Sequence, residues 1–183
     1  MKAKKRAAKI KMILMDVDGT LTDGSLLVMP DGEELKSFNV RDGMGVWLAQ
    51  LAGLQVGIVT GKISKSLVKR AERLKITEVY QGVMDKKPIL DGILEKHGLK
   101  PDQVAYVGDD LGDLEVIRTV GLAAAVADAH PIVKKNSDYI CELPGGKGAV
   151  REFIEFIIES QGKWEMIQKR IKEIFNQNRN NLR

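Results

Sequence analysis

Cysteine and aromatic residues are scarce in this chain: Cys141 is the single cysteine among 183 residues, and aromatic residues make up 5%. A single cysteine excludes an internal disulfide and a cysteine-ligated metal cluster, and it favours a reducing compartment. No apolar run approaches the length of a membrane span, and the apolar stretch after the basic start is too short for a signal peptide. We therefore expect a cytoplasmic protein with no membrane partner.

Positive charge is in excess only at the two ends of the chain. Residues 1–11 carry six Lys or Arg and no acid, and residues 162–183 carry six basic and two acidic residues. Since the whole chain has a formal charge of +4, the body from 12 to 161 must carry −6. Basic ends can bind nucleic acid, but no aromatic residue interleaves with the basic ones at the N-terminus, which favours solvated tails. We expect no nucleic-acid partner.

The length of 183 residues and the apolar content of 44% suit one domain with a full core. We expect a single domain over 1–183, with a basic N-terminal arm at 1–10 and a C-terminal segment at 162–183. Apolar residues in that segment recur at helical spacing, which predicts an amphipathic helix followed by a polar tail at 176–181. The residues at this spacing are Trp164, Ile167, Ile171 and Ile174.

The sequence Met-Ile-Leu-Met at 12–15 leads directly into Asp16 and Asp18. A run that is apolar at every position is typical of a strand buried on both faces. Residues two apart in an extended chain point the same way, so both carboxylates would emerge at the carboxyl end of this strand, where α/β sheets bind ligands. Such a pair favours a bound cation, usually Mg²⁺, or a shared proton. The alternative is an ordinary polar turn, since Asp and Gly are common turn residues.

Further apolar runs alternate with segments of helical pattern along the whole chain. The predicted strands cover 12–15, 55–59, 79–80, 103–107, 122–126 and 138–141, and the predicted helices 42–52, 63–74, 88–97, 111–119, 130–135 and a last one ending near 160. Asp42 is the expected N-cap of the first of these helices. The alternation predicts an α/β fold, a Rossmann-like parallel sheet with helices on both faces. Two short runs around Asp31-Gly32 predict a small β-hairpin inserted after the first strand, over 26–38.

Polar residues follow the predicted strands at their carboxyl ends. Thr60 and Gly61 follow the second strand, Asp109, Asp110 and Asp113 follow the fourth, and Lys86 opens a helix between them. In a parallel sheet these ends lie along one edge. Together they offer carboxylates for a metal, a hydroxyl beside a backbone N–H, and a compact positive charge, a set that suits a phosphate held against Mg²⁺. Each motif alone is common; Asp110, for example, could simply cap a helix.

The four motifs, Asp-x-Asp-Gly-Thr, Thr-Gly, Lys and Gly-Asp-Asp-x-x-Asp, resemble in kind and order those of the haloacid dehalogenase superfamily phosphatases. The strings at 38–43, 80–82, 107–111, 126–131 and 145–152 resemble a family within it, the 3-deoxy-D-manno-octulosonate 8-phosphate (KDO 8-phosphate) phosphatases. The resemblance covers roughly residues 10–160. It implies Mg²⁺-dependent hydrolysis of KDO 8-phosphate to the free sugar acid and phosphate, in lipopolysaccharide precursor synthesis.

The resemblance also implies a role for each motif residue. Asp16 would be the nucleophile that forms an aspartyl-phosphate, and Asp18 the general acid and base. Thr60 would hold the phosphoryl group together with the N–H of Gly61, and Lys86 would neutralise charge in the transition state.

Metal and substrate residues follow from the same resemblance. Asp16, Asp109 and the backbone carbonyl of Asp18 would bind Mg²⁺, while Asp110 and Asp113 would act through water or orient their neighbours. The expected substrate-binding residues are Asp18, Thr60, Gly61, Arg41, Lys62 and Lys86.

The family implies no large cap domain and a homotetramer in which the hairpins build a shared barrel and a neighbour's C-terminal segment covers the site. A polar tail near Arg179 could then reach the substrate of another subunit.

The chain departs from the family at Lys62, where Arg is usual, because Lys lacks the bidentate fork that binds a carboxylate. A phosphatase for a nine-carbon sugar-acid 9-phosphate is therefore an alternative, although the sequence Arg41-Asp42-Gly43 favours the octulosonate. A non-catalytic scaffold relative is a second alternative, against which the complete catalytic set argues.

Overall fold

The computed structural model describes residues 2–181. Its strands are β1 (Met12–Met15), β2 (Leu27–Val28), β3 (Glu34–Leu35), β4 (Gln55–Val59), β5 (Glu78–Tyr80), β6 (Val104–Gly108), β7 (Leu122–Ala125) and β8 (Tyr139–Ile140). Its helices are α1 (Lys2–Ala7), α2 (Val40–Leu51), α3 (Lys65–Arg73), α4 (Lys87–His97), α5 (Leu114–Thr119), α6 (Pro131–Asn136), α7 (Ala149–Ser160) and α8 (Trp164–Asn181), with 3₁₀ turns η1 (Pro101–Gln103) and η2 (Leu111–Asp113).

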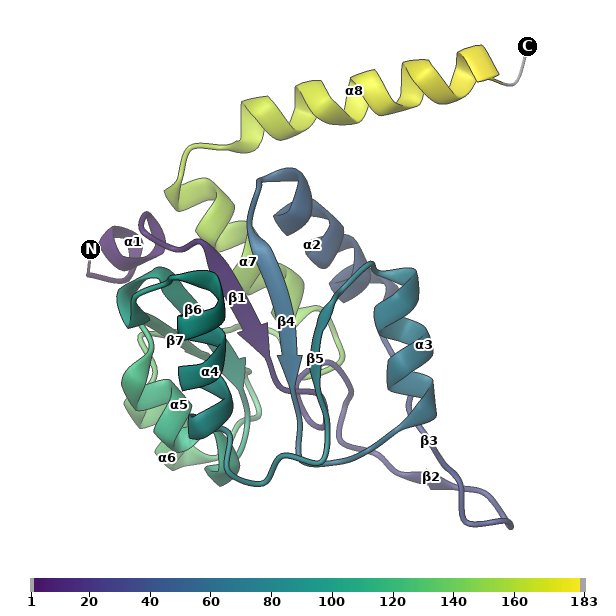
Figure 1. Cartoon of the computed structure of the whole chain (residues 1–183), viewed down its shortest axis with the longest axis vertical. Coiled ribbons are helices and arrows are strands. Elements are labelled where there is room, and N and C mark those ends of the chain that lie inside the picture. Colours follow the sequence, from purple (N-terminus) through teal and green to yellow (C-terminus); the bar gives the residue numbers. More distant parts are fainter. Residues whose placement is uncertain (1, 182–183) are drawn as a thin grey trace.

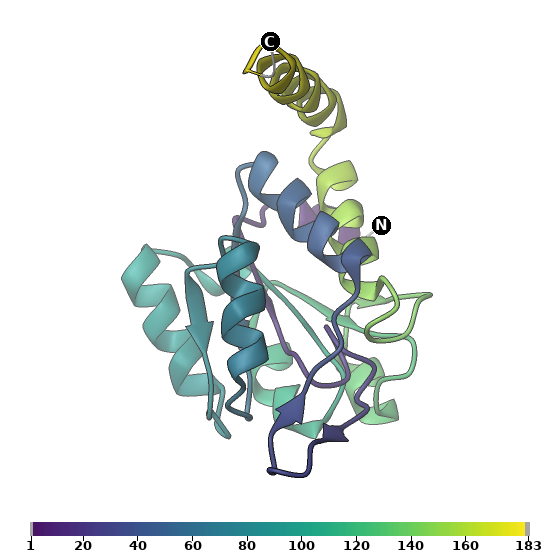
Figure 2. The same ribbon diagram turned by 90° about the vertical axis from the view of Figure 1, so that its right-hand side faces the viewer.

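Six parallel strands form the central sheet, in the order β5-β4-β1-β6-β7-β8 (Figure 1). This is the strand order of the Rossmann fold, which places the ligand crevice beside the first strand, where the order reverses. Helices α2, α3 and α7 lie to one side of the sheet and α4, α5 and α6 to the other (Figure 2). The predicted fold class is therefore confirmed, and no large cap domain is present in residues 2–181.

Strand β1 occupies the middle of the sheet, and all four of its side chains are buried. Its last residue, Met15, pairs with Ile58 of β4 on one side and with Val107 of β6 on the other. The register continues one residue further, since the Asp16 N–H donates to the carbonyl of Val107 over 3.0 Å. The three strands consequently end at the same level, which sets the residues that follow them side by side.

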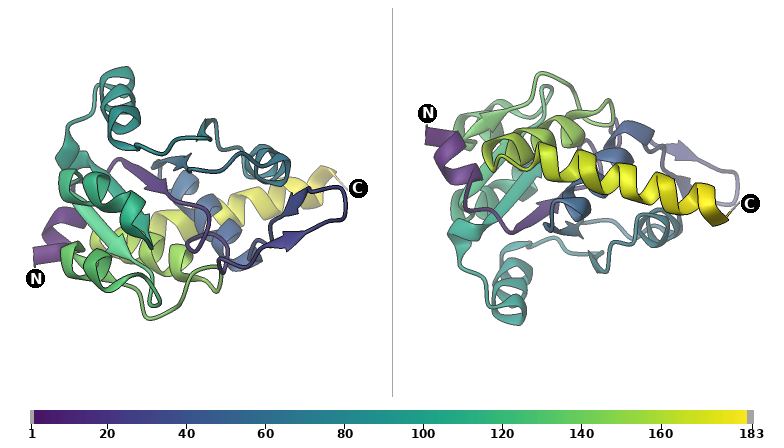
Figure 3. Two further views of the ribbon diagram at one scale, coloured as in Figure 1. Left: turned by 90° about the horizontal axis from the view of Figure 1, so that it is seen from below. Right: turned by 90° about the horizontal axis from the view of Figure 1, so that it is seen from above.

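The predicted hairpin is present, but its strands β2 and β3 have only two residues each, with Leu27 opposite Leu35. The hairpin extends away from the body at the carboxyl end of the sheet (Figure 3). Leu27 and Val28 are both 60% exposed in the single chain. An isolated two-stranded hairpin with an exposed apolar side is marginally stable, so this element depends on contacts with something else.

The basic N-terminal arm differs from the solvated tail that its composition predicts. Residues of the arm form helix α1, whose Ala7 is fully buried, and Ile10 behind it is 2% exposed. Arg6 pairs with Asp138 over 2.5 Å, and Lys9 with Asp102 over 3.3 Å. The acidic body thus binds the arm, which a count of local charge could not reveal because the acidic partners lie about a hundred residues away in sequence.

Helix α2 begins earlier than predicted. Its N-cap is Asn39, whose side chain accepts a hydrogen bond from the N–H of Arg41. Asp42, the expected cap, is instead buried in the first turn, where its carboxylate accepts from the N–H of Arg151 over 3.0 Å. The prediction that Asp42 caps the helix is therefore wrong. Its side chain instead joins α2 to the start of α7.

The C-terminal helix α8 runs on through the polar residues 176–181, where a tail was predicted. Its first turns are fixed to the body: Ile167 is fully buried, and Lys163 and Arg170 donate to carbonyls at the end of α2. The helix leaves the body at the end opposite to the hairpin and the carboxyl ends of the strands (Figures 1 and 3). It therefore cannot cover the site of its own chain. Within residues 2–181, none of the helices combines the length and the apolar composition that crossing a membrane requires.

We predict that the two halves of α8 contribute differently to stability. Ile167→Ala should lower the free energy of unfolding by about 2–4 kcal/mol, because it opens a cavity in the core. Ile174→Ala, on the same face but partly exposed, should cost less than about 1 kcal/mol. Urea unfolding followed by circular dichroism measures both. Equal losses would contradict this and would mean that the distal half of α8 is packed, for instance against another copy.

Candidate active site

The strand ends converge on one cavity of about 250 Å³. Its lining includes almost all of the residues that the sequence singled out: Asp16, Asp18, Thr60, Gly61, Lys62, Lys86, Asp109, Asp110 and Asp113, together with Val83, Met84 and Gly112. They come from the loops after β1, β4 and β6 and from the segment before α4. The predicted gathering of these residues at one edge of the sheet is what the structure shows.

The loop after β1 turns tightly so that Asp109 can approach it. The carbonyl of Val17 accepts the N–H groups of Thr20, Leu21 and Thr22. Gly19 adopts a φ of +86°, and a Cβ placed there would lie 2.1 Å from Oδ2 of Asp109. A glycine is therefore required here both by the backbone conformation and by the close carboxylate. The Thr20 hydroxyl donates to Oδ1 of Asp109 over 3.0 Å and fixes that carboxylate in place.

Three carboxylates form the centre of the cavity. Asp16, Asp109 and Asp113 each bring one oxygen to within 4.8 Å of the others. Burial raises the pKa of Asp16 to about 6. Repulsion from Asp113 adds to this rise, while the attraction of Lys86 opposes it. Burial and the charges of Asp16 and Asp113 raise the pKa of Asp109 to about 7. Oxygen ligands that repel one another this strongly fit a hard divalent cation such as Mg²⁺.

Lys86 is the cation that the fold itself places among these carboxylates. Its ammonium donates to Asp16 over 2.5 Å, to Asp113 over 2.7 Å and to the Tyr106 hydroxyl over 3.1 Å, and its side chain is 7% exposed. Burial alone would lower the pKa of Lys86, but the charges of Asp16 and Asp113 outweigh it and raise the pKa. Lys86 therefore stays charged and holds Asp16 in position.

Asp113 acts as a support and not as a free ligand. Its Oδ1 accepts from Lys86 and, over 2.6 Å, from the Tyr106 hydroxyl, while its Oδ2 accepts the N–H groups of Asp109 and Asp110. With both oxygens occupied, Asp113 orients Lys86 and the loop that carries Asp109. Asp110 is more exposed and accepts the N–H of Leu111, so its capping role is confirmed.

Asp18 lies outside the carboxylate cluster, and its partner comes from the hairpin. The Lys36 ammonium donates to Oδ1 of Asp18, and the Lys36 side chain is 2% exposed. Thr60 lines the cavity, and its backbone is fixed there by hydrogen bonds from its N–H to the carbonyl of Tyr80 and from the N–H of Val83 to its carbonyl.

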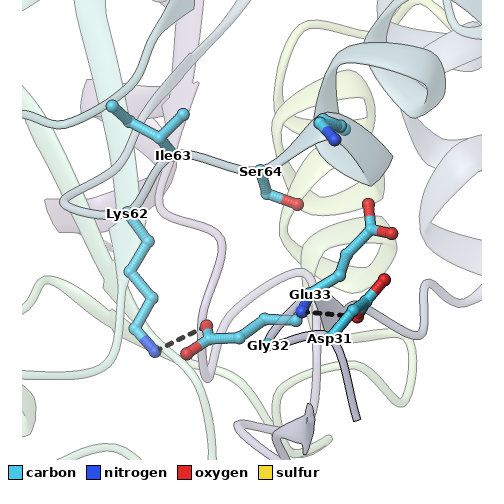
Figure 4. A pocket seen from close by; sticks show the side chains of 8 residues that line it. Asp31, Gly32, Glu33, Lys62, Ile63 and Ser64 are labelled. Atoms are coloured by element: carbon cyan, nitrogen blue, oxygen red, sulfur yellow. Dashed lines mark hydrogen bonds and ion pairs between the residues drawn. The ribbon is translucent and has the colours of Figure 1, made fainter. Parts of the chain in front are cut away.

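Lys62 joins this cavity to a larger one of about 660 Å³ between the hairpin tip and the start of α3. Figure 4 shows its side chain reaching toward the hairpin, where it pairs with Glu34 over 3.1 Å. The larger cavity is lined by Asp31, Gly32, Glu33, Glu34, Lys62, Ile63, Ser64 and Lys65. Space for the remainder of a substrate therefore lies next to the carboxylate centre.

Arg41, an expected substrate-binding residue, is not brought to either cavity. It stands in the first turn of α2 and lines a separate hollow with Leu143, Gly148 and Arg151. The role of Arg41 in binding substrate therefore stays a prediction.

Sequence reasoning missed two residues of the site, Lys36 and Tyr106. Tyr106 left a signal, since a hydroxyl inside a strand that is otherwise apolar needs a buried partner, here Asp113 and Lys86. The sequence contains no comparable signal for Lys36, because the residues around it do not indicate which face of a short hairpin packs against the body.

Known proteins resemble this chain over most of its length. The sequence pattern of the haloacid dehalogenase-like hydrolases matches residues 59–154. The 3-deoxy-D-manno-octulosonate 8-phosphate phosphatase KdsC of Escherichia coli (strain K12) is 45% identical over 158 residues, which are 86% of this chain and 84% of that protein. The protein of the same name from Yersinia pestis is 45% identical over 160 residues, covering 87% of this chain and 86% of its own.

Solved structures agree with these sequence relatives. The crystal structure of the phosphatase from Yersinia pestis has a TM-score of 0.88 to this chain at 44% identity, covering 90% of this chain and 89% of that one. The phosphatase from Moraxella catarrhalis, solved with a magnesium ion, a phosphate ion and a KDO molecule, has a TM-score of 0.90 at 36% identity, covering 93% of this chain and 98% of that one.

We predict that proton binding and Mg²⁺ compete for the carboxylate centre. The raised pKa values of about 6 for Asp16 and about 7 for Asp109 mean that the folded, metal-free protein binds more protons than the unfolded chain. Their contribution to stability is complete below the ordinary value of 3.8 and is lost as the pH rises through 6 to 7. The metal-free melting temperature should therefore fall between about pH 5 and about pH 8, and Mg²⁺ should raise it more at the higher pH.

Asp109→Asn is the matched control, since its amide neither titrates nor repels Asp16. We expect a smaller pH slope and a smaller Mg²⁺ effect in this variant, measured by thermal unfolding in EDTA and in Mg²⁺. Identical slopes in the wild type and the variant would overturn the assignment of these carboxylates.

Proposed function

Because the chain belongs to the haloacid dehalogenase-like hydrolases and, within them, to the family of KDO 8-phosphate phosphatases, we propose that it hydrolyses KDO 8-phosphate. The products are the free sugar acid and inorganic phosphate, in the synthesis of lipopolysaccharide precursors. One observation supports this proposal above all: Asp16, Lys86 and Asp109 lie together in one cavity. Asp18 also lines that cavity.

In the first half of the reaction Asp16 is the nucleophile. One of its carboxylate oxygens forms a bond to phosphorus, and the bond between phosphorus and the sugar oxygen breaks. Asp18 gives a proton to the departing sugar oxygen, so that an alcohol leaves and not an alkoxide. Lys86, 2.5 Å from Asp16, keeps the attacking carboxylate ionised and oriented.

In the second half water replaces the sugar. Asp18 takes a proton from the water, the oxygen of that water bonds to phosphorus, and the bond to Asp16 breaks to release phosphate and restore the carboxylate. The Thr60 hydroxyl and the N–H of Gly61 hold the phosphoryl oxygens in both halves. Lys86 neutralises part of the charge that builds on them.

Magnesium is the cofactor that the carboxylate centre fits. Asp16 and Asp109 would hold it through their side chains, and Asp18 through its backbone carbonyl. When bound, the ion supplies positive charge that offsets both the repulsion of the carboxylates and the charge of the phosphate.

The larger cavity at the hairpin is proposed to take the sugar acid, with Lys62 facing its carboxylate. Since Lys62 replaces the usual Arg of the family, a nine-carbon sugar-acid 9-phosphate stays the alternative substrate. A non-catalytic scaffold is disfavoured, because Asp16, Asp18, Thr60 and Lys86 all line the same cavity.

We also propose that the protein is a homotetramer assembled through its hairpins. Leu27 is exposed and lies opposite Leu35 in the hairpin, so these two residues supply an apolar surface that such an interface would cover. Coverage of a neighbour's site by α8 near Arg179 and a cytoplasmic location stay predictions of the sequence.

We predict that Asp16→Asn abolishes turnover. Removing the nucleophile should lower kcat by about 10⁴-fold or more, because the amide of the variant cannot form the bond to phosphorus that the Asp16 carboxylate forms. Phosphate release in Mg²⁺ measures this, and EDTA should abolish the wild-type rate. Retained activity in the variant would exclude the aspartyl-phosphate route.

We predict that KDO 8-phosphate is preferred over the nine-carbon 9-phosphate and over simple sugar phosphates by at least about tenfold in kcat/KM. Lys62→Met should raise KM about tenfold with a smaller change in kcat, whereas Lys62→Arg should keep or lower KM because its fork can bind a carboxylate in two hydrogen bonds. Lys69→Met is the matched control, because Lys69 is an exposed lysine of α3 that pairs with Glu72 on the same helix. A preference for the nine-carbon substrate would keep the mechanism and reject the octulosonate assignment.

A further inference from the structure

The hairpin presents two charged side chains to the site, one from Glu34 in β3 and one from Lys36, the residue directly after that strand. Glu34 pairs with Lys62 over 3.1 Å, and Lys36, two residues on, pairs with Asp18. Residues i and i+2 of an extended strand share a side, while Leu35 between them points the other way. The hairpin is therefore attached to the catalytic loops by two ion pairs of opposite polarity.

The Lys36 pair differs from the surface ion pairs of this chain. The side chain of Lys36 is 2% exposed and that of Asp18 is 27% exposed, whereas Lys69 and Glu72 are 75% and 57% exposed. An exposed pair contributes little and fixes neither partner. A lysine ammonium removed from water to this extent is tolerated only when it is paired, and it holds its partner in one position.

The contact also distinguishes the two oxygens of Asp18. Lys36 donates to Oδ1, which leaves Oδ2 as the oxygen that can exchange a proton. We propose that Lys36 is a positioning residue of the reaction: it fixes the Asp18 carboxylate so that Oδ2 serves the departing sugar oxygen and then the attacking water. Lys36 keeps its own protons throughout, and the bonds made and broken are those of the two half-reactions above. This inference rests on the proposed phosphatase function.

The test separates proton transfer from other effects by changing the leaving group. A sugar alcohol is a poor leaving group that needs a proton, whereas the phenolate of p-nitrophenyl phosphate is a weak base and leaves without one. Proton transfer from a correctly positioned general acid contributes about 10²–10⁴-fold, and only where the leaving group needs a proton. Lys36→Met should therefore lower kcat on KDO 8-phosphate by about 100-fold and on p-nitrophenyl phosphate by less than about fivefold.

Two further variants keep this readout independent of folding. Lys36→Arg should restore part of the KDO 8-phosphate rate, because a guanidinium can still pair with Oδ1. Lys36→Gln gives the same comparison of leaving groups if the methionine variant does not fold, as judged by thermal unfolding with and without Mg²⁺. Lys69→Met, remote from the site and paired with Glu72, should leave both rates within about twofold of wild type.

Equal losses on both substrates would overturn the inference and assign Lys36 a purely structural role, and unchanged rates would remove any role. Failure of the proposed function is a different result: the wild type would then hydrolyse p-nitrophenyl phosphate but not KDO 8-phosphate. In that case the alkyl phosphate that the wild type hydrolyses fastest takes its place, and the ratio between leaving groups still decides the role of Lys36.

Discussion

The close approach of Asp16, Asp109 and Asp113 is the constraint on which the site depends. Three acidic side chains meet where β1 and β6 end, and Lys86 is the cation that the fold brings among them. Burial, and the repulsion among three carboxylates that one lysine cannot neutralise, raise the pKa values of Asp16 and Asp109. The remaining negative charge makes the site a receptor for a divalent cation, and with it for a phosphate.

Around this centre, charge also decides how the outer parts of the chain attach. The basic arm docks on the acidic body through Arg6 and Lys9, and the hairpin through Glu34 and Lys36. The hairpin lacks a core of its own, so its position depends on these pairs and on whatever covers its apolar side. The hairpin, which extends from the body in Figure 1, therefore contributes a partner to the Asp18 carboxylate at the edge of the site.

Much of the fold could be predicted because its signals are local. Continuous apolar runs predicted the buried strands. The polar residues directly after Met15 and Val59 predicted the position of the site, since parallel strands end along one edge of the sheet. Two of the errors have the same physical origin. Asp42 was expected to cap a helix and α1 to be a solvated arm, but each has a partner distant in sequence, Arg151 for Asp42 and Asp138 for Arg6.

The sequence by itself determined the sheet, the order of its catalytic motifs and the chemistry of a carboxylate centre with one lysine, because strand periodicity and residue type act over a few neighbours. Only the tertiary structure decided that Asp113 supports Lys86, that Lys36 holds Asp18 and that Arg41 points elsewhere. Those outcomes depend on how a two-residue-strand hairpin and the helix ends pack on the body. Packing of this kind pairs side chains far apart along the chain and leaves no periodic signal in the sequence.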